Sequence, residues 1–131
     1  MEAAKPAGIA FPDALDALRC ETGRIEASFA SKLVATLDPS KPVVDSIVLG
    51  HFELRLPYRK LPDRQAKVVA LYRQLCTNYA QLIDSPTGVL LTELFDLRYP
   101  GNILTPLKKI DLVLWQIRAA RTSAHMLRRS R

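Results

Sequence analysis

Arginine side chains crowd the carboxyl end of the chain, where the segment RAARTSAHMLRRSR (118–131) holds five arginines and no acid. Side chains three and four residues apart share one face of a helix. The sequence therefore predicts a basic stripe made of Arg118, Arg121, His125 and Arg128, with Arg129 and Arg131 beside its end. Such a row of cations suits a phosphate backbone and gives a salt-dependent affinity. The alternative is the solvated end of a helix, whose dipole favours cations.

A second group of cations lies in the middle of the chain, just before and within the first turn of a helix that we predict to begin at Asp63. Its members are Arg55, Arg59, Lys60, Arg64 and Lys67. The charge of the chain is unevenly divided, because residues 1–50 carry five cations against seven anions while residues 51–131 carry fourteen against six. This asymmetry indicates a surface that meets a polyanion such as a nucleic acid, or one half of the chain that neutralises the other. Aromatic residues that would stack on bases are scarce near these cations.

Small residues next to the basic stripe allow a second helix to approach closely. They belong to the segment Ala119–Ala124, and Trp115 and Met126 share a flank with Ala119 and Thr122. Packing within the chain is the default interpretation. The alternative is an exposed patch for a protein partner or a second copy, formed by Trp115, Ala119, Thr122 and Met126.

Residues with the spacing of a catalytic or metal site are missing from the sequence. The two histidines, His51 and His125, stand alone, and Cys20 and Cys76 are far apart. Neither a zinc pattern nor a phosphate-binding glycine loop nor a nucleophile elbow occurs. We therefore expect no cofactor, no metal and no enzymatic activity, and we expect both thiols to be reduced in the cytoplasm.

The elements that must position these residues are predominantly helical. Apolar residues recur at helical spacing in four stretches, which begin at Pro12, Asp63, Pro86 and Pro106. The first is expected to run as one helix to Leu37, with Leu15, Leu18, Ile25, Phe29 and Leu33 on its buried face. Between the first two stretches, prolines bound a connector that we expect to be extended, and a small β-hairpin around residues 43–56 is the alternative.

The pair of helices around residues 77–95 has the outline of a DNA-binding helix-turn-helix. Its second helix would have to contact bases, yet it carries Glu93 and Asp96, which would face phosphates. That helix is also rich in apolar residues: Val89, Leu90, Leu91, Leu94 and Phe95. We therefore expect it to be a buried core helix.

The segment ALDALRCETGRIEASF (14–29) resembles the first-helix pattern of helical chorismate mutases, in which a leucine-arginine pair precedes isoleucine-acid pairs. The resemblance implies that Arg19 would bind a substrate carboxylate. The sequence then departs from the pattern, because only Lys32 and Lys41 stand where the family has a further arginine and a lysine. A core-facing helix is the interpretation that we favour for this segment.

Together these patterns predict an all-α fold, a compact bundle of about four helices with one extended proline-bounded connector. We expect residues 1–11 to form a flexible arm and residues 12–131 to form a single helical domain. No apolar run reaches the length of a membrane span, so no membrane partner is expected. The favoured function is a non-catalytic adaptor or accessory subunit that docks on a protein and presents a basic surface. A nucleic-acid-binding regulator is the first alternative, and a small helical enzyme acting on an anionic metabolite is the second.

Overall fold

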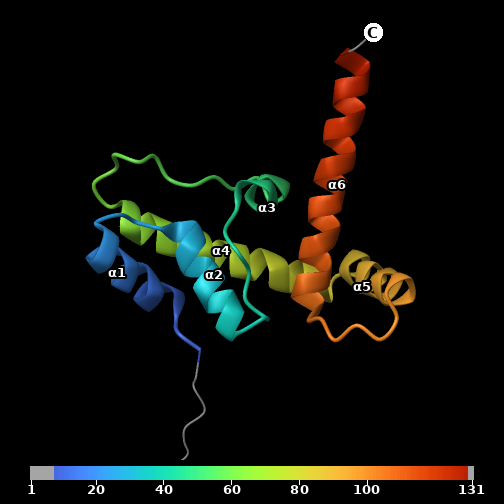
Figure 1. The fold of residues 1–131 in the computed structure, drawn as a ribbon, viewed down its shortest axis with the longest axis horizontal. Coiled ribbons are helices and arrows are strands. Elements are labelled where there is room, and N and C mark those ends of the chain that lie inside the picture. Colours follow the sequence, from blue (N-terminus) through green and yellow to red (C-terminus); the bar gives the residue numbers. More distant parts are fainter. Residues whose placement is uncertain (1–7, 130–131) are drawn as a thin grey trace, which may run out of the picture.

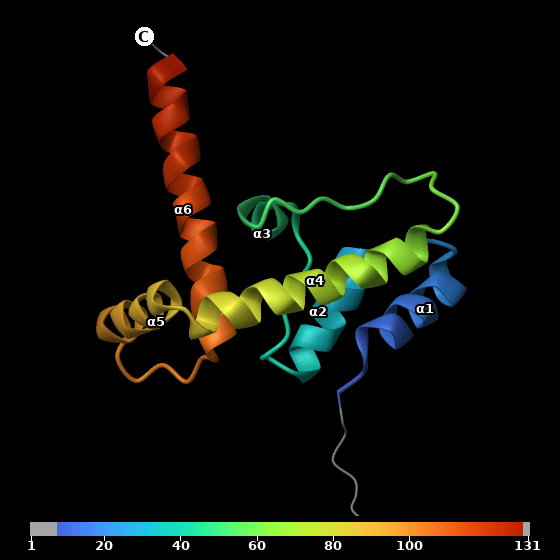
Figure 2. The ribbon, with the colours of Figure 1, turned by 180° about the vertical axis from the view of Figure 1, so that it is seen from behind.

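Helices account for all the regular structure in the computed structural model, which describes the backbone of residues 8–129 and the side chains of residues 8–117. The described part contains six helices and no β-strand. The helices are α1 (Phe11–Thr22), α2 (Ala27–Leu37), α3 (Ser46–His51), α4 (Arg64–Asp84), α5 (Pro86–Arg98) and α6 (Pro106–Arg129). Helix α4 spans the molecule, with α1 and α2 along one end and α5 and α6 at the other (Figures 1 and 2). The predicted all-α, bundle-like fold is confirmed.

The prediction of one continuous helix up to Leu37 is wrong, because the segment forms two helices, α1 and α2. Gly23 adopts a left-handed conformation with φ of 74°, and its N–H donates to the carbonyl oxygen of Arg19. Glycine is the residue that ends helices in this way. The break also resets the helical register, so α2 buries Ala27, Ala30 and Val34 while Phe29 and Leu33, expected in the core, are exposed.

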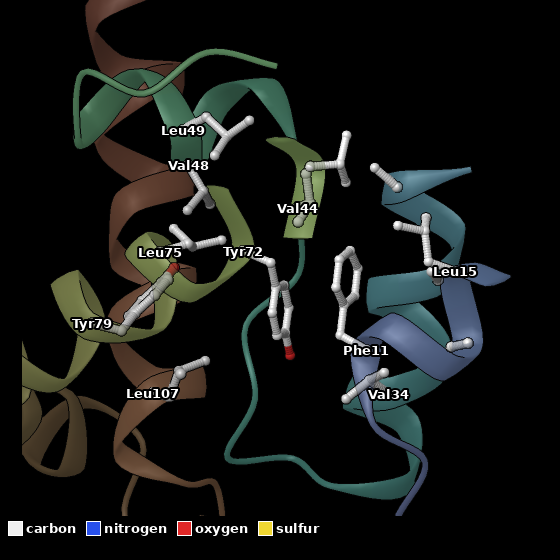
Figure 3. Close-up of a cluster of buried hydrophobic side chains, with 14 of the residues drawn as sticks. Phe11, Leu15, Val34, Val44, Val48, Leu49, Tyr72, Leu75, Tyr79 and Leu107 are labelled. Carbon is white, nitrogen blue, oxygen red and sulfur yellow. The ribbon is translucent and has the colours of Figure 1, made fainter. Parts of the chain in front are cut away.

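Helix α1 begins at Phe11, one residue before its expected start. The ring of Phe11 is buried and stacks on Tyr72 of α4, with ring centroids 3.9 Å apart (Figure 3). Phe11 therefore belongs to the core and not to an arm. Residues 1–7 lie outside the described part of the chain.

The proline-bounded connector contains a short helix in addition to extended chain. Asp45 caps α3, since its carboxylate accepts hydrogen bonds from the N–H groups of Ile47 and Val48 at 2.8 and 3.0 Å. After α3, Glu53 takes a left-handed conformation and Leu54 donates its N–H to Leu49, which completes a Schellman ending. Neither strand of the alternative hairpin forms in these described residues. The chain then runs without regular structure to α4.

The helical stretches predicted to begin at Asp63 and Pro106 form the two long helices α4 and α6. Helix α4 buries Val68, Tyr72, Leu75 and Tyr79, and the first half of α6 buries Leu107, Ile110 and Leu114. Ser85 caps α5 by accepting a hydrogen bond from the N–H of Gly88, and Thr105 accepts one from Lys108 at the start of α6. Figure 3 shows Leu75, Tyr79 and Leu107 together with Val48 of α3 in this core.

Polar contacts fix α3 and α4 against α6. The ring nitrogen Nε2 of His51 lies 3.0 Å from the carbonyl oxygen of Leu114, and the hydroxyl of Tyr79 donates to the buried carboxylate of Asp111 at 3.0 Å. Thr105 also donates its hydroxyl to the carbonyl oxygen of Pro39. These bonds place the beginning of α6 firmly in the core, while its later turns project beyond the other helices (Figures 1 and 2).

The predicted burial of the helix after Ser85 is wrong. In α5 only Gly88 is buried among its thirteen residues. Helix α5 packs on α4 and α6 along one narrow side, and the rest of its surface faces solvent. Periodicity had identified the helix and its apolar residues, but the chain does not supply enough neighbours to cover them.

A candidate protein-docking surface

The outward side of α5 carries four large apolar side chains, which we name the α5 apolar face: Val89, Leu90, Leu94 and Leu97. Their relative exposures are 46%, 53%, 52% and 78%. Residues four and seven positions apart lie one above the other on a helix, so Leu90, Leu94 and Leu97 form a continuous ridge. Helix α5 lies at one end of the molecule (Figure 1).

The side of α5 nearer to α6 is apolar as well. Phe95 and Tyr99 line a groove of about 550 Å³ together with Leu112 and Trp115 of α6. A helix with large apolar residues on two of its sides normally has protein on both of them. Clusters of exposed apolar residues of this kind mark surfaces that bind other proteins.

The charged residues of α5 differ in whether they have a partner within the described structure. Asp96 accepts from the ammonium group of Lys109 at 2.7 Å and from the side-chain amide of Asn102 at 2.9 Å. The bond from Lys109 and then the bond from Asn102 lower the pKa of Asp96. Arg98 lies over the ring of Tyr99, 5.0 Å from its centroid. Glu93, which is exposed in the middle of the α5 apolar face, has no ion pair with another described residue.

The predicted basic residues of the connector fall into two groups. Arg55, Arg59 and Lys60 are exposed in the irregular segment between α3 and α4. Arg64 is half-buried and bonds to backbone, because its Nε donates to the carbonyl oxygen of Pro57 at 3.2 Å and another nitrogen reaches Ile25. Lys67 pairs with Asp63 at 3.7 Å. Among the described residues, the side chains of the other three cations form no hydrogen bond or ion pair.

An aromatic ring accompanies the three exposed cations, although aromatic residues are scarce in this part of the sequence. Tyr58 is 67% exposed and directly precedes Arg59 and Lys60. We name Arg55, Tyr58, Arg59 and Lys60 the basic loop. In both views the basic loop and the later turns of α6 rise from the same edge of the molecule (Figures 1 and 2).

The remaining predicted site residues are concentrated in α6. Trp115 is 44% exposed and lines the groove beside α5. The side chains of the basic stripe and of its small-residue flank lie outside the described residues: Arg118, Ala119, Arg121, Thr122, His125, Met126, Arg128, Arg129 and Arg131. The backbone is helical from Pro106 to Arg129.

The segment that resembles chorismate mutases does not form one helix, since the turn at Gly23 interrupts it. Arg19 is exposed on α1 and donates a hydrogen bond to the side-chain oxygen of Gln65 on α4. Burial raises the pKa of the Cys76 thiol, which disfavours a thiolate there. Within the described residues no group of three histidine, cysteine or acidic side chains has the arrangement of a metal site.

Comparison with known proteins gives no relative for this fold and surface: no family model, curated protein or solved structure matches the chain. None of the helices in the described part combines the length and apolar character needed to cross a membrane.

The α5 apolar face was missed by sequence reasoning, although its signal was present. The segment from Val89 to Leu97 is apolar on nearly every side of a helix, and Glu93 is the acid that interrupts its outer ridge. A fully enclosed helix has no place for such a carboxylate without a partner. The position of Glu93 could therefore have indicated a side of the helix that is open in the monomer.

Proposed function

We propose that the chain is a non-catalytic adaptor or accessory subunit, which docks on a protein partner through the α5 apolar face and presents a basic surface elsewhere. The observation that carries the proposal is the exposure of Leu90, Leu94 and Leu97 on a helix whose side toward the α6 groove, with Phe95, is apolar as well. Covering these side chains would remove apolar surface from water, at about 25 cal/mol for each square ångström.

The basic surface of the proposal lies at the other end of α4. The exposed cations Arg55, Arg59 and Lys60 belong to the basic loop, which joins the amino-terminal end of α4. The docking helix α5 follows the carboxyl-terminal end of α4 directly. The two surfaces are therefore separate, and one molecule would have room for both contacts. The exposed thiol of Cys20 suits a reducing compartment, and we include a cytoplasmic location in the proposal.

Substitution of the ridge tests the docking function. Leu94→Asp places a charge on the α5 apolar face, whereas Leu37→Asp places the same charge on an exposed leucine of α2. We expect tagged wild-type protein to copurify with a stoichiometric partner from its native cell, the Leu37→Asp variant to retain that partner and the Leu94→Asp variant to lose it. Unfolding curves of both variants establish that they are folded. Retention of the partner by Leu94→Asp would refute docking through α5.

A second candidate function is contact with single-stranded nucleic acid, and the observation that favours it is the exposed ring of Tyr58 beside Arg59 and Lys60. Aromatic stacking contributes about 1–3 kcal/mol for each base, and cations add a salt-dependent attraction.

Fluorescence polarisation with a labelled oligonucleotide at two salt concentrations tests this candidate. Tyr58→Ala should weaken binding at both concentrations, and Arg59→Gln should reduce the salt dependence. Tyr99→Ala, which removes an exposed ring outside the basic loop, serves as the control. If the wild-type protein binds neither DNA nor RNA at low salt, this candidate is withdrawn.

A further inference from the structure

The chemistry of the docking partner is restricted by one side chain of α5. Glu93 lies within the α5 apolar face, and its neighbours one turn away on the same side are Val89, Leu90, Asp96 and Leu97. No cation stands three or four residues from Glu93 in either direction. Asp96, the one polar neighbour, is itself an acid that is already paired with Lys109.

A partner that covers the leucine ridge must also cover this carboxylate. A charge taken out of water is strongly destabilising unless an opposite charge or several donors receive it. Because α5 offers no such group one turn from Glu93 and no described residue forms an ion pair with it, we expect the group to come from the partner. We propose that the partner, as required by the docking function proposed above, is an amphipathic helix of another protein that places a lysine or arginine opposite Glu93.

The shape of the surface favours a helix as the occupant. Leu90, Leu94 and Leu97 have the spacing i, i+4 and i+7, which is the pattern by which two helices interdigitate. The thirteen residues of α5 extend for about 20 Å, so a partner helix of three to four turns would match them.

Two other occupants are disfavoured by charge. In a two-fold pairing of α5 with a second copy, centred on the ridge, Glu93 would lie close to its own counterpart among leucines. A lipid surface is disfavoured because helices that lie on membranes carry lysine and arginine around their apolar side. Helix α5 offers Arg98 alone, against Glu93 and Asp96.

A displayed library of helical peptides tests the inference with the full-length chain. The peptides keep leucines at i, i+4 and i+7, and the intervening positions are randomised among Lys, Arg, Glu, Asp, Gln and Ala. We expect wild-type protein to enrich Lys or Arg over acids at one position by at least about tenfold. The Glu93→Lys variant should enrich acids there, and Glu93→Gln should bind with no charge preference.

Each result of the selection has a separate meaning. Enrichment that Leu94→Asp abolishes but that lacks any charge preference overturns the cationic partner and leaves docking through α5 intact. No enrichment above the Leu94→Asp background overturns the inference, while copurification with the native partner still decides the docking function independently. A dimer in sedimentation velocity that Leu94→Asp dissociates would identify a second copy as the occupant and would also overturn the inference.

Discussion

Two tyrosines of α4 are both buried, yet their hydroxyl groups have different surroundings. The hydroxyl of Tyr79 donates to Asp111, whereas the hydroxyl of Tyr72 is buried without a hydrogen-bond partner among the described residues. Burial raises the pKa of both phenols, so both remain protonated at neutral pH. A buried polar group without a hydrogen-bond partner destabilises the folded state. A buried carboxylate that loses its donor destabilises the folded state more.

These surroundings predict opposite effects for the same substitution. Tyr79→Phe removes the donor to Asp111 and should reduce the free energy of unfolding by about 1–3 kcal/mol. Tyr72→Phe removes only the unpartnered hydroxyl and keeps the ring stacked on Phe11, so the free energy of unfolding should be unchanged or higher. Urea denaturation of the two variants at neutral pH measures both values. Equal losses would contradict the assignment of the Tyr79–Asp111 bond as the stabilising contact.

The buried carboxylate of Asp111 makes stability depend on pH. Burial raises its pKa above the ordinary 3.8, more than the bond from Tyr79 and the charge of Lys108 lower it. A raised acid pKa means that the folded state holds its proton more tightly than the unfolded state. The resulting stabilisation is complete below the ordinary pKa and is lost as pH rises through the folded pKa.

The Asp111→Asn variant should therefore differ from the wild type in its free energy of unfolding, and this difference should change with pH in a predictable direction. The asparagine oxygen still accepts from Tyr79 but does not ionise. We expect the free energy of unfolding of the variant, minus that of the wild type, to increase as pH rises from about 4 to about 7. Parallel urea titrations at both pH values measure this difference. A difference that decreases over the same range would show that ionised Asp111 is favoured in the folded state.

At the scale of the element, sequence patterns predicted the positions of helices better than they predicted which sides of those helices are buried. The helical stretches that form α4 and α6 were predicted from the spacing of their apolar residues, because α4 and the first turns of α6 each bury a single side in one core. The break at Gly23 could not be predicted from the glycine alone, because glycine inside a helix costs only about 1 kcal/mol and does not by itself decide between a helix and a turn. The burial of Leu90 and Leu94 depends on how many neighbours the chain supplies, which local periodicity does not contain.

The corner between α4 and α5 depends on a glycine for a steric reason. A methyl group at Gly88 would overlap the carbonyl oxygen of Leu82, whereas one at Gly50 in α3 would meet no atom within 4 Å. Gly88→Ala should therefore lower the free energy of unfolding by about 2 kcal/mol or more. Gly50→Ala should raise it by roughly 0.5–1 kcal/mol, as usual for glycine in a helix. Thermal unfolding of both variants measures the contrast, and a harmless Gly88→Ala would show that α5 is free to move on α4.

At the scale of the whole molecule, the core residues that the described part of α6 contributes all come from its first turns. The core residues Leu107, Ile110 and Leu114 all precede residue 118. Deletion of residues 121–131 should therefore change the free energy of unfolding by less than about 1 kcal/mol. If nucleic acid is bound, the same deletion should reduce the slope of log affinity against log salt by about 0.9 for each phosphate contact removed. Loss of cooperative unfolding would instead make this segment structural.

Helix α4 determines how far apart two bound molecules would be held. Its 21 residues extend for about 31 Å, the basic loop leads into its amino-terminal end, and the close fit at Gly88 fixes the direction in which α5 leaves the other end. A protein bound at one end and an oligonucleotide bound at the other would be tethered at that spacing without any flexible linker. Each would then meet the other at a high effective concentration only if their own binding sites match this length. The rigid rod of α4 would thereby select which assemblies the chain is able to bridge.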